Sequence, residues 1–218
     1  MKRRINRFLS KIWRFLNRLR YPQLQGDRHS ITVISANCIG GIAMKSLNMA
    51  FHTPTINLYI TMPDFVRFCA NLAYYLREEV QEDLEESQKE NMLVCRLGDI
   101  RLYCVHYATF EQFQKAWNRR VARVHLDNIF LVMTDRDGFT EELLPQIAQL
   151  PYQKVLFSHK AYPSYPFVKQ VKRYENMGQV GLLTEFWGIS GVRLFDLEFN
   201  FGKQLAEMAK KIEPTNQA

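Results

Sequence analysis

Apolar residues follow two alternating patterns along this chain. Short apolar runs rich in β-branched residues at 31–36, 54–60, 128–134 and 154–159 are typical of buried strands. Between most of these runs, apolar residues recur every three or four positions, as on one face of a helix. The alternation predicts an α/β fold with three layers, in which helices cover both faces of a mostly parallel sheet.

The longest helical pattern begins at Pro63 and Asp64, because proline suits the first turn of a helix and an acid suits its positive end. Apolar residues keep helical spacing from Phe65 to Leu84, so one long helix is expected there. The acidic stretch 77–90 at its end is most simply a solvated face.

Three further helices are predicted from capping residues. Thr109 and Gln112 form a capping box, Thr140 caps a helix that reaches about Gln149, and Asp196 caps a last helix. Cations on the Thr109 helix are interpreted either as phosphate ligands or as a solvated face. They are Lys115, Arg119, Arg120 and Arg123.

A β-hairpin is predicted where the runs 92–97 and 100–107 are separated by Gly98-Asp99, since a two-residue turn led by glycine suits paired strands. We expect this hairpin to add an antiparallel pair to the parallel sheet, which would make the sheet mixed. Together with the helices this gives a single α/β domain over 31–212.

The first twenty residues predict a basic amphipathic helix at 2–20, followed by a linker at 21–30. Cations with an apolar aromatic face are typical of a helix that lies in a membrane interface. A helix packed on its own domain or on a partner, and a calmodulin-type target helix, are the alternatives. Its apolar positions are Ile5, Phe8, Leu9, Ile12, Trp13, Phe15, Leu16 and Leu19. The polar residues 213–218 are expected to form a tail.

Charge and cysteines narrow the class of protein. The formal charge is +7, but residues 1–20 carry eight cations and no acid, so residues 21–218 sum to −1. A domain that binds nucleic acid should itself be basic, so nucleic acid is not an expected partner. The four cysteines form no C-x-x-C pair or zinc spacing, which favours reduced thiols and a cytoplasmic location.

The turn after the first strand is the best candidate for a site, because ligands of open α/β sheets bind at the carboxyl ends of strands. It reads Ser35-Ala-Asn-Cys-Ile-Gly-Gly41 and leads into a helical pattern. The backbone N–H groups of such a turn could hold an oxyanion or a diphosphate. Asn37, Gly40 and Gly41 are therefore candidate binding residues.

These residues also support a resemblance. A succession of short motifs, from about residue 31 to the 170s, resembles a bacterial domain family of unknown function found in exopolysaccharide and capsule biosynthesis gene clusters. The resemblance implies a role in surface polysaccharide biosynthesis but no agreed mechanism. Where this chain has His159, similar proteins usually read Ser/Thr-Lys. The matching motifs are Ser35-x-Asn-Cys-x-Gly-Gly41, Pro54-Thr-Ile-x-Leu, Met62-Pro-Asp-Phe-Val, Leu72-x-Tyr-Tyr75, His106-Tyr107, Trp117-x-Arg-Arg120, Asp127-Asn128, Thr140-Glu-Glu-Leu143 and Tyr162-Pro163.

Acyl transfer is the first candidate reaction. Cys38 at a helix start would gain thiolate character, which makes it a candidate nucleophile. His106 would act as the base, and Asp127 or Asp135 would orient it, as in a catalytic triad. We back Cys38, His106 and Asp135; the alternative is a buried structural cysteine with glycines that only make a turn.

Glycosyl or sugar-phosphate transfer is the second candidate. Asp135 and Asp137 resemble the acidic pair of sugar-nucleotide transferases, which would hold Mg²⁺ or Mn²⁺, although an aspartate-rich turn explains the motif as well. Arg120 would bind phosphate, and Tyr162 in an aromatic loop would stack on a sugar ring. No cofactor is otherwise implied.

A non-catalytic accessory protein of polysaccharide assembly is the third candidate. For every reading, the expected partners are a lipid-linked or nucleotide-linked sugar and the inner membrane surface, contacted through residues 2–20. The expected location is the cytoplasmic face of the bacterial cell membrane.

Overall fold

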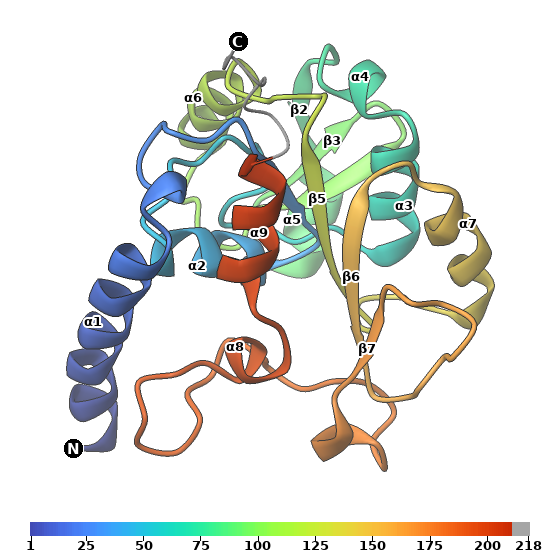
Figure 1. Cartoon of the computed structure of the whole chain (residues 1–218). Coiled ribbons are helices and arrows are strands. Elements are labelled where there is room, and N and C mark those ends of the chain that lie inside the picture. The colour runs from blue at the N-terminus through green and yellow to red at the C-terminus, as the bar shows by residue number, and fades with distance from the viewer. Residues whose placement is uncertain (211–218) are drawn as a thin grey trace, which may run out of the picture.

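The structure, a computed structural model, describes residues 1–210 (Figure 1). Residues 211 and 212 of the predicted domain and the predicted tail 213–218 lie outside the described residues. The main sheet contains four parallel strands in the order β1-β5-β6-β7. These strands are β1 (Thr32–Ser35), β5 (Ile129–Thr134), β6 (Gln153–Ser158) and β7 (Val168–Gln170). The predicted α/β class is therefore confirmed.

Helices cover both faces of the main sheet, which confirms the three layers. Side chains alternate along β5: Phe130 and Val132 join one apolar core, and Leu131 and Met133 join the other. The first core is covered by α2 (Cys38–Ser46), α8 (Leu194–Glu198) and α9 (Phe201–Lys210). The second core is covered by α3 (Met62–Ala70), α4 (Leu72–Tyr75), α6 (Phe110–Val121), η2 (Glu141–Leu143) and α7 (Leu144–Gln149).

The predicted hairpin is present as β3 (Val94–Leu97) and β4 (Ile100–Tyr103). It does not join the main sheet: together with β2 (Val80–Glu82) it forms a separate antiparallel sheet. The reason is packing, because buried side chains of the hairpin share an apolar core with α3. The expectation of a single mixed sheet is wrong in this respect. The hairpin side chains in that core are Cys95, Leu97, Ile100 and Leu102.

The expected long helix from Pro63 to Leu84 is interrupted. α3 ends at Ala70, and α4, β2 and α5 (Leu84–Glu90) follow. Helical spacing persists in the sequence because Leu72, Tyr75 and Val80 are also buried, although they lie on different elements. The expected last helix is likewise divided, with Asp196 inside α8 rather than at a cap.

The apolar run 54–60 is predicted to be a strand, but it is a loop with bends at residues 54, 56 and 57. It pairs with the second sheet only through a bridge between Tyr59 and Tyr103. The loop crosses the end of β1, where the Ile60 N–H donates to the carbonyl of Ala36 and the Thr55 hydroxyl accepts from the Ser35 N–H. These contacts close the carboxyl end of β1 on one side.

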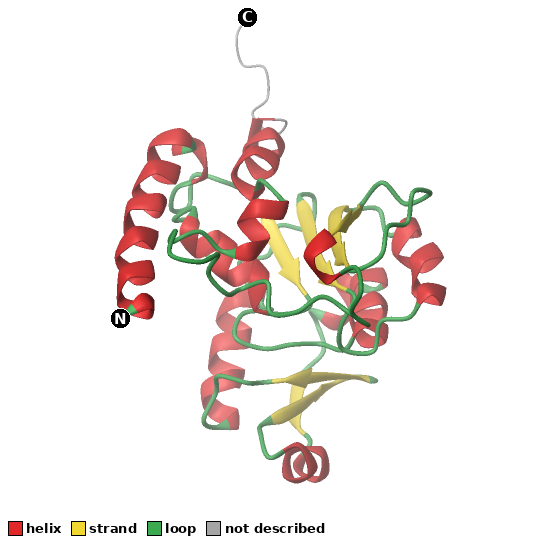
Figure 2. Cartoon of the chain, turned by 90° about the horizontal axis from the view of Figure 1, so that it is seen from below, coloured by secondary structure: helices red, strands yellow, loops and turns green. Residues whose placement is uncertain are grey.

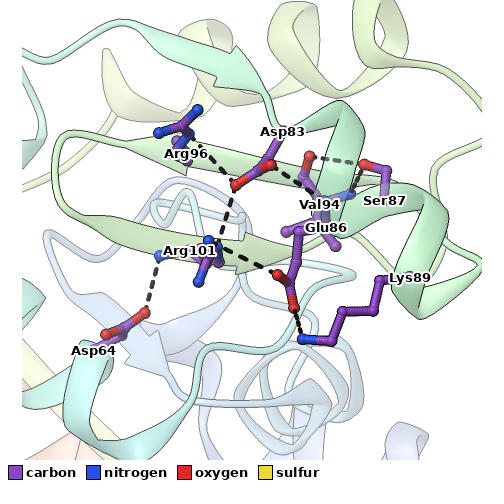
Figure 3. A network of polar contacts seen from close by, with 8 residues as sticks. All are labelled: Asp64, Asp83, Glu86, Ser87, Lys89, Val94, Arg96 and Arg101. Carbon is purple, nitrogen blue, oxygen red and sulfur yellow. Dashed lines mark hydrogen bonds and ion pairs between the residues drawn. The ribbon is translucent and has the colours of Figure 1, made fainter.

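The acids of α5 do more than face solvent (Figure 3). Asp83 is buried, accepts the N–H of Glu86 as the helix cap, and contacts Arg96 and Arg101 of the hairpin. The Arg101 N–H also donates to Asp64 at 2.9 Å. The network therefore ties α5 and α3 to the hairpin, and a purely solvated acidic face is not what the fold contains.

The predicted N-terminal helix is present as α1 (Lys2–Arg20), and Figure 2 shows it along one side of the molecule. Its Asn6 is buried, donates to the carbonyl of Gly188 at 2.7 Å and accepts from the Gly191 N–H at 2.9 Å. Within residues 1–210, no helix combines the length and the apolar character needed to cross a bilayer.

The segment that follows α1 is packed against the domain. Tyr21 is buried, and η1 (Pro22–Leu24) carries Leu24 into the core beneath α9. The remaining short helix, η3 (Lys172–Tyr174), follows β7. Residues 21–30 thus contain ordered, buried positions as well as exposed ones.

Candidate functional site

Cys38 and His106 line the same cavity of about 520 Å³, which is the central finding for the candidate site. Cys38 is the first residue of α2, directly after the end of β1, and His106 lies in the turn after β4. The wall also carries two cations, Lys45 and Arg120. We call this space the Cys38 cavity. Its other lining residues include Thr55, Ile56, Asn57 and Asn48.

The backbone amides of the turn are already occupied. Asn37 caps α2 by accepting the N–H of Ile39 at 3.1 Å, and the Ser35 hydroxyl accepts the N–H of Gly40 at 3.2 Å. The Asn37 amide also donates to Thr134 at 3.0 Å. The expected oxyanion hole or phosphate cradle is therefore not supported, because two of its donors are engaged inside the protein.

The two glycines serve close packing. A Cβ on Gly40 would lie 2.6 Å from the Ser35 Cβ, and a Cβ on Gly41 would lie 3.0 Å from the Ile56 Cδ1. Real Cβ atoms do not approach as closely as at Gly40, so α2 can lie against β1 only with glycine there, whereas the contact at Gly41 is tight but involves only the end of the Ile56 side chain. Gly40 therefore has a structural role, and Gly41 also lines the Cys38 cavity.

Burial raises the pKa of the Cys38 thiol, whereas a helix start was expected to lower it. Desolvation disfavours the thiolate, and no cation offsets it in the residues described. The thiol is therefore protonated at rest and needs a base to react. The other cysteines, Cys69, Cys95 and Cys104, are buried in the core.

Asp135 does not orient His106. Its buried carboxylate accepts from the ring Nδ1 and the backbone N–H of His159, from the Ser158 hydroxyl at 3.0 Å and from the Val180 N–H at 2.8 Å. The expected triad of Cys38, His106 and Asp135 is thus not assembled, because the Asp135 carboxylate, directly after β5, is bonded to residues at the end of β6 and to Val180. Asp135 and His159 instead line a separate cavity of about 510 Å³.

Asp135 and Asp137 are not brought together in one cavity. Asp137 has a φ of 53° and lines a third cavity, of about 390 Å³, together with Asn37 and Cys38. The two carboxylates therefore serve different cavities. Within residues 1–210, no group of three or more His, Cys, Asp or Glu side chains is placed to hold a metal ion.

The two remaining predicted residues are separated as well. Arg120 donates to the Tyr107 hydroxyl and, at 3.4 Å, to the Ile56 carbonyl, which fixes its guanidinium at the edge of the Cys38 cavity. Tyr162 donates to Glu141 at 3.0 Å and lines the Asp135–His159 cavity. Of the eight predicted site residues and Asp137, the Cys38 cavity contains Cys38, Gly41, His106 and Arg120.

Comparison with known proteins identifies the family. Residues 9–201 match the domain of unknown function DUF1919. The chain belongs to this family. A protein of Haemophilus influenzae, named only as an uncharacterized protein, is similar to it: 35% of 190 aligned residues are identical, covering 87% of this chain and 89% of the relative.

Two histidine arrangements in this DUF1919 chain escaped the sequence reasoning. His159 was set aside because similar proteins usually read Ser/Thr-Lys there, yet it pairs with Asp135. His29, His52 and His125 converge in space, with ring centroids 4.7 Å and 4.9 Å apart. No spacing in the sequence marks this second group, because three distant segments supply it.

Proposed function

We propose that this DUF1919 protein is a transferase of surface polysaccharide biosynthesis that moves an acyl group, such as acetyl, onto a phosphate-linked sugar. The observation that carries the proposal is the shared cavity of Cys38 and His106, a nucleophile and a base with two cations in the same wall. The family resemblance described for the sequence supports the pathway. The cations Lys45 and Arg120 suit an anionic, lipid-linked or nucleotide-linked sugar.

Because burial raises the pKa of the Cys38 thiol, the proposed reaction needs a base. His106 takes the thiol proton, and the sulfur attacks the carbonyl carbon of an acyl thioester donor. The bond to the donor thiol breaks, and that thiol leaves with the proton from His106. A sugar hydroxyl then attacks the acyl group on Cys38 while His106 removes its proton, which returns to the cysteine.

The first step can be tested without knowing the sugar. The full chain is incubated with acetyl-coenzyme A, and intact-protein and peptide mass spectrometry locate any acetyl group. We expect acetylation of Cys38 in the wild type, its loss in Cys38→Ala, and slower acetylation in His106→Gln. The absence of acetylation on Cys38 in the wild type would contradict acyl transfer.

Sugar-nucleotide transfer is a second candidate because of Asp137. Burial raises the pKa of this carboxyl, which lines a cavity at the carboxyl ends of β1 and β5 beside Arg136. A carboxyl of raised pKa suits a general base or acid. Binding of uridine diphosphate sugars, with and without Mn²⁺, that is lost in Asp137→Asn but retained in Cys38→Ala would favour this reaction.

Residues 2–20 support a place on the cytoplasmic face of the cell membrane. Six apolar side chains of α1 point away from the domain, while Asn6 on another side of the helix holds it to residues 188–191. Apolar residues beside many cations suit an interface rich in anionic lipid. These outward side chains are Ile5, Phe8, Ile12, Phe15, Leu16 and Leu19.

A non-catalytic role would have a distinct signature. A folded wild-type protein that binds anionic vesicles, yet neither accepts an acetyl group nor binds sugar nucleotides, would be a membrane-recruited accessory protein. The acetylation assay and the sugar-nucleotide binding assay therefore separate the two transfer reactions from the accessory role.

A further inference from the structure

Three histidines meet at the end of the main sheet opposite to the catalytic candidates. His29 precedes β1, His52 lies in the loop after α2, and His125 lies between α6 and β5. Their rings are in contact, with centroids 4.7 Å apart for His29 and His52 and 4.9 Å apart for His52 and His125. They line a cavity of about 600 Å³ near the amino ends of β1 and β5, which we call the His/Arg cavity.

Two ring nitrogens in this cluster have no hydrogen-bond partner among the described residues. His29 accepts the Ile31 N–H at its Nδ1, so the neutral ring carries its proton on Nε2, which is buried and unpaired. His52 contacts Asp27 through Nε2 at 2.9 Å, and its buried Nδ1 is unpaired. Buried polar atoms usually find partners, so such exceptions indicate a place where a ligand or water completes the structure.

Three arginines of the α6 end supply the charge. Arg119, Arg120 and Arg123 line the His/Arg cavity, and within residues 1–210 no carboxylate forms an ion pair with any of them. Asp27, the acidic residue of the lining, contacts His52 instead. Burial lowers the pKa of His29 to about 4, so that ring is neutral at physiological pH and the arginines dominate.

We propose that the His/Arg cavity binds the phosphate groups of a soluble phosphorylated small molecule, such as a nucleoside diphosphate. Guanidinium groups match phosphate oxygens in pairs, and the Nε2–H of His29 is a further buried donor without a partner among the described residues. A cavity of about 600 Å³ has room for a diphosphate with an attached group. Binding itself does not rest on the acyl-transfer reaction.

The position of this cavity connects it to the candidate reaction site. Phe51 and Arg120 line both the His/Arg cavity and the Cys38 cavity. The two cavities therefore adjoin at Phe51 and Arg120. Arg120 is already held in place by Tyr107, so its guanidinium is positioned before any ligand arrives.

Inorganic pyrophosphate is the probe for the experiment, with the full chain and isothermal titration calorimetry. Because two charge-assisted contacts are lost, Arg119→Ala with Arg123→Ala should weaken binding at least ~10-fold. Lys115→Ala on the same helix does not touch the cavity and serves as the control. No saturable binding by the wild type, or equal affinity in the double variant and the control, would overturn the proposal.

The histidines report where the probe binds. The chain has five, and their ring signals can be followed by NMR. Pyrophosphate should shift the signals of His29, His52 and His125 and leave His159 unchanged. Shifts at His106 alone would place the anion in the Cys38 cavity and contradict the assignment.

The last experiment measures binding to vesicles that contain anionic lipid, because a lipid headgroup also carries phosphate. The wild type and the Arg119→Ala, Arg123→Ala double variant should bind vesicles equally, since the soluble ligand is the proposed occupant. Loss of vesicle binding in the double variant, with pyrophosphate affinity unchanged, would assign these arginines to the membrane surface instead.

Discussion

The Asp135 carboxylate accepts hydrogen bonds from both the ring and the backbone N–H of His159. The same carboxylate also accepts from Ser158 of β6 and from Val180, far along the chain. It therefore joins the ends of β5 and β6 to the segment that leads into α8. This pattern is typical of a buried polar hub that stabilises the fold.

Replacement of Asp135 should destabilise the protein far more than replacement of His159. Asp135→Asn keeps the size but turns an NH₂ group toward buried donors, so we expect a loss of about 3 kcal/mol in the free energy of unfolding. His159→Ala removes only one partner and should cost about 1 kcal/mol. Urea denaturation measures both. An Asp135→Asn protein that is as stable as the wild type but inactive would instead make Asp135 catalytic.

Iodoacetamide should alkylate only Cys38 in the native protein. The other three cysteines are buried, whereas Cys38 is partly exposed. Burial raises its pKa, so the rate should keep rising with pH beyond the value of about 8.5 for a free thiol. The rate is followed by mass spectrometry, with Cys38→Ser as the control. A midpoint well below that value would show an activated thiolate and contradict the burial effect.

Asp83 should stabilise the protein only where its carboxyl is charged. The N–H of Glu86 and the nearby arginines lower the pKa of Asp83 in the folded state. Its contribution is therefore present above the unfolded pKa of about 4 and is lost as the pH falls through the lower folded pKa. Asp83→Ala removes a helix cap and should cost about 1 kcal/mol near neutral pH.

The stability difference between Asp83→Ala and the wild type should shrink below about pH 4. Thermal unfolding at several pH values measures it. Glu85→Ala removes the same charge from the same helical turn and should have little effect. A stability difference that stays constant down to about pH 2, well below the pKa of free carboxyls, would show that the charge of Asp83 does not contribute to stability.

The apolar face of α1 should determine membrane binding. Phe8→Ser, Phe15→Ser and Leu19→Ser together remove three exposed apolar side chains, each contributing about 1.5–3 kcal/mol when fully buried. Sedimentation with anionic vesicles should show at least a ~10-fold loss of binding. Leu84→Ser with Leu126→Ser changes exposed apolar residues elsewhere and is the control. Equal losses in both variants would contradict a role for α1.

Local patterns predicted the elements with strong signatures. Residues 128–134 were recognisable as a buried strand, and the Thr109 cap forms as expected, accepting the Gln112 N–H at 3.3 Å. The break at Asn71 was not predictable, because Leu72 and Val80 continue the helical spacing while packing from other elements. Periodicity records which residues are buried, not which element buries them.

The site was predictable only where neighbours in sequence are neighbours in space. Cys38 and Asn37 could be placed at the end of β1 from the turn alone. The partner of Asp135 could not, because the sequence does not show that β6, which leads to His159, lies beside β5, while β4, which leads to His106, belongs to a separate sheet. The His29, His52 and His125 cluster depends on three separate loops, so only the assembled fold reveals it.

The hydrogen bonds of Asn6 to Gly188 and Gly191 fix the rotation of α1 about its own axis. A Cβ on Gly191 would lie 2.5 Å from the α1 backbone, so the helix lies directly against this loop. Tyr21 and Leu24 then bury the chain immediately after the helix. Whatever surface receives the outward apolar side chains therefore meets the domain in one orientation. The cavities would then lie at a fixed height and tilt above that surface, because α1 is held rigidly against the domain and not by a flexible linker.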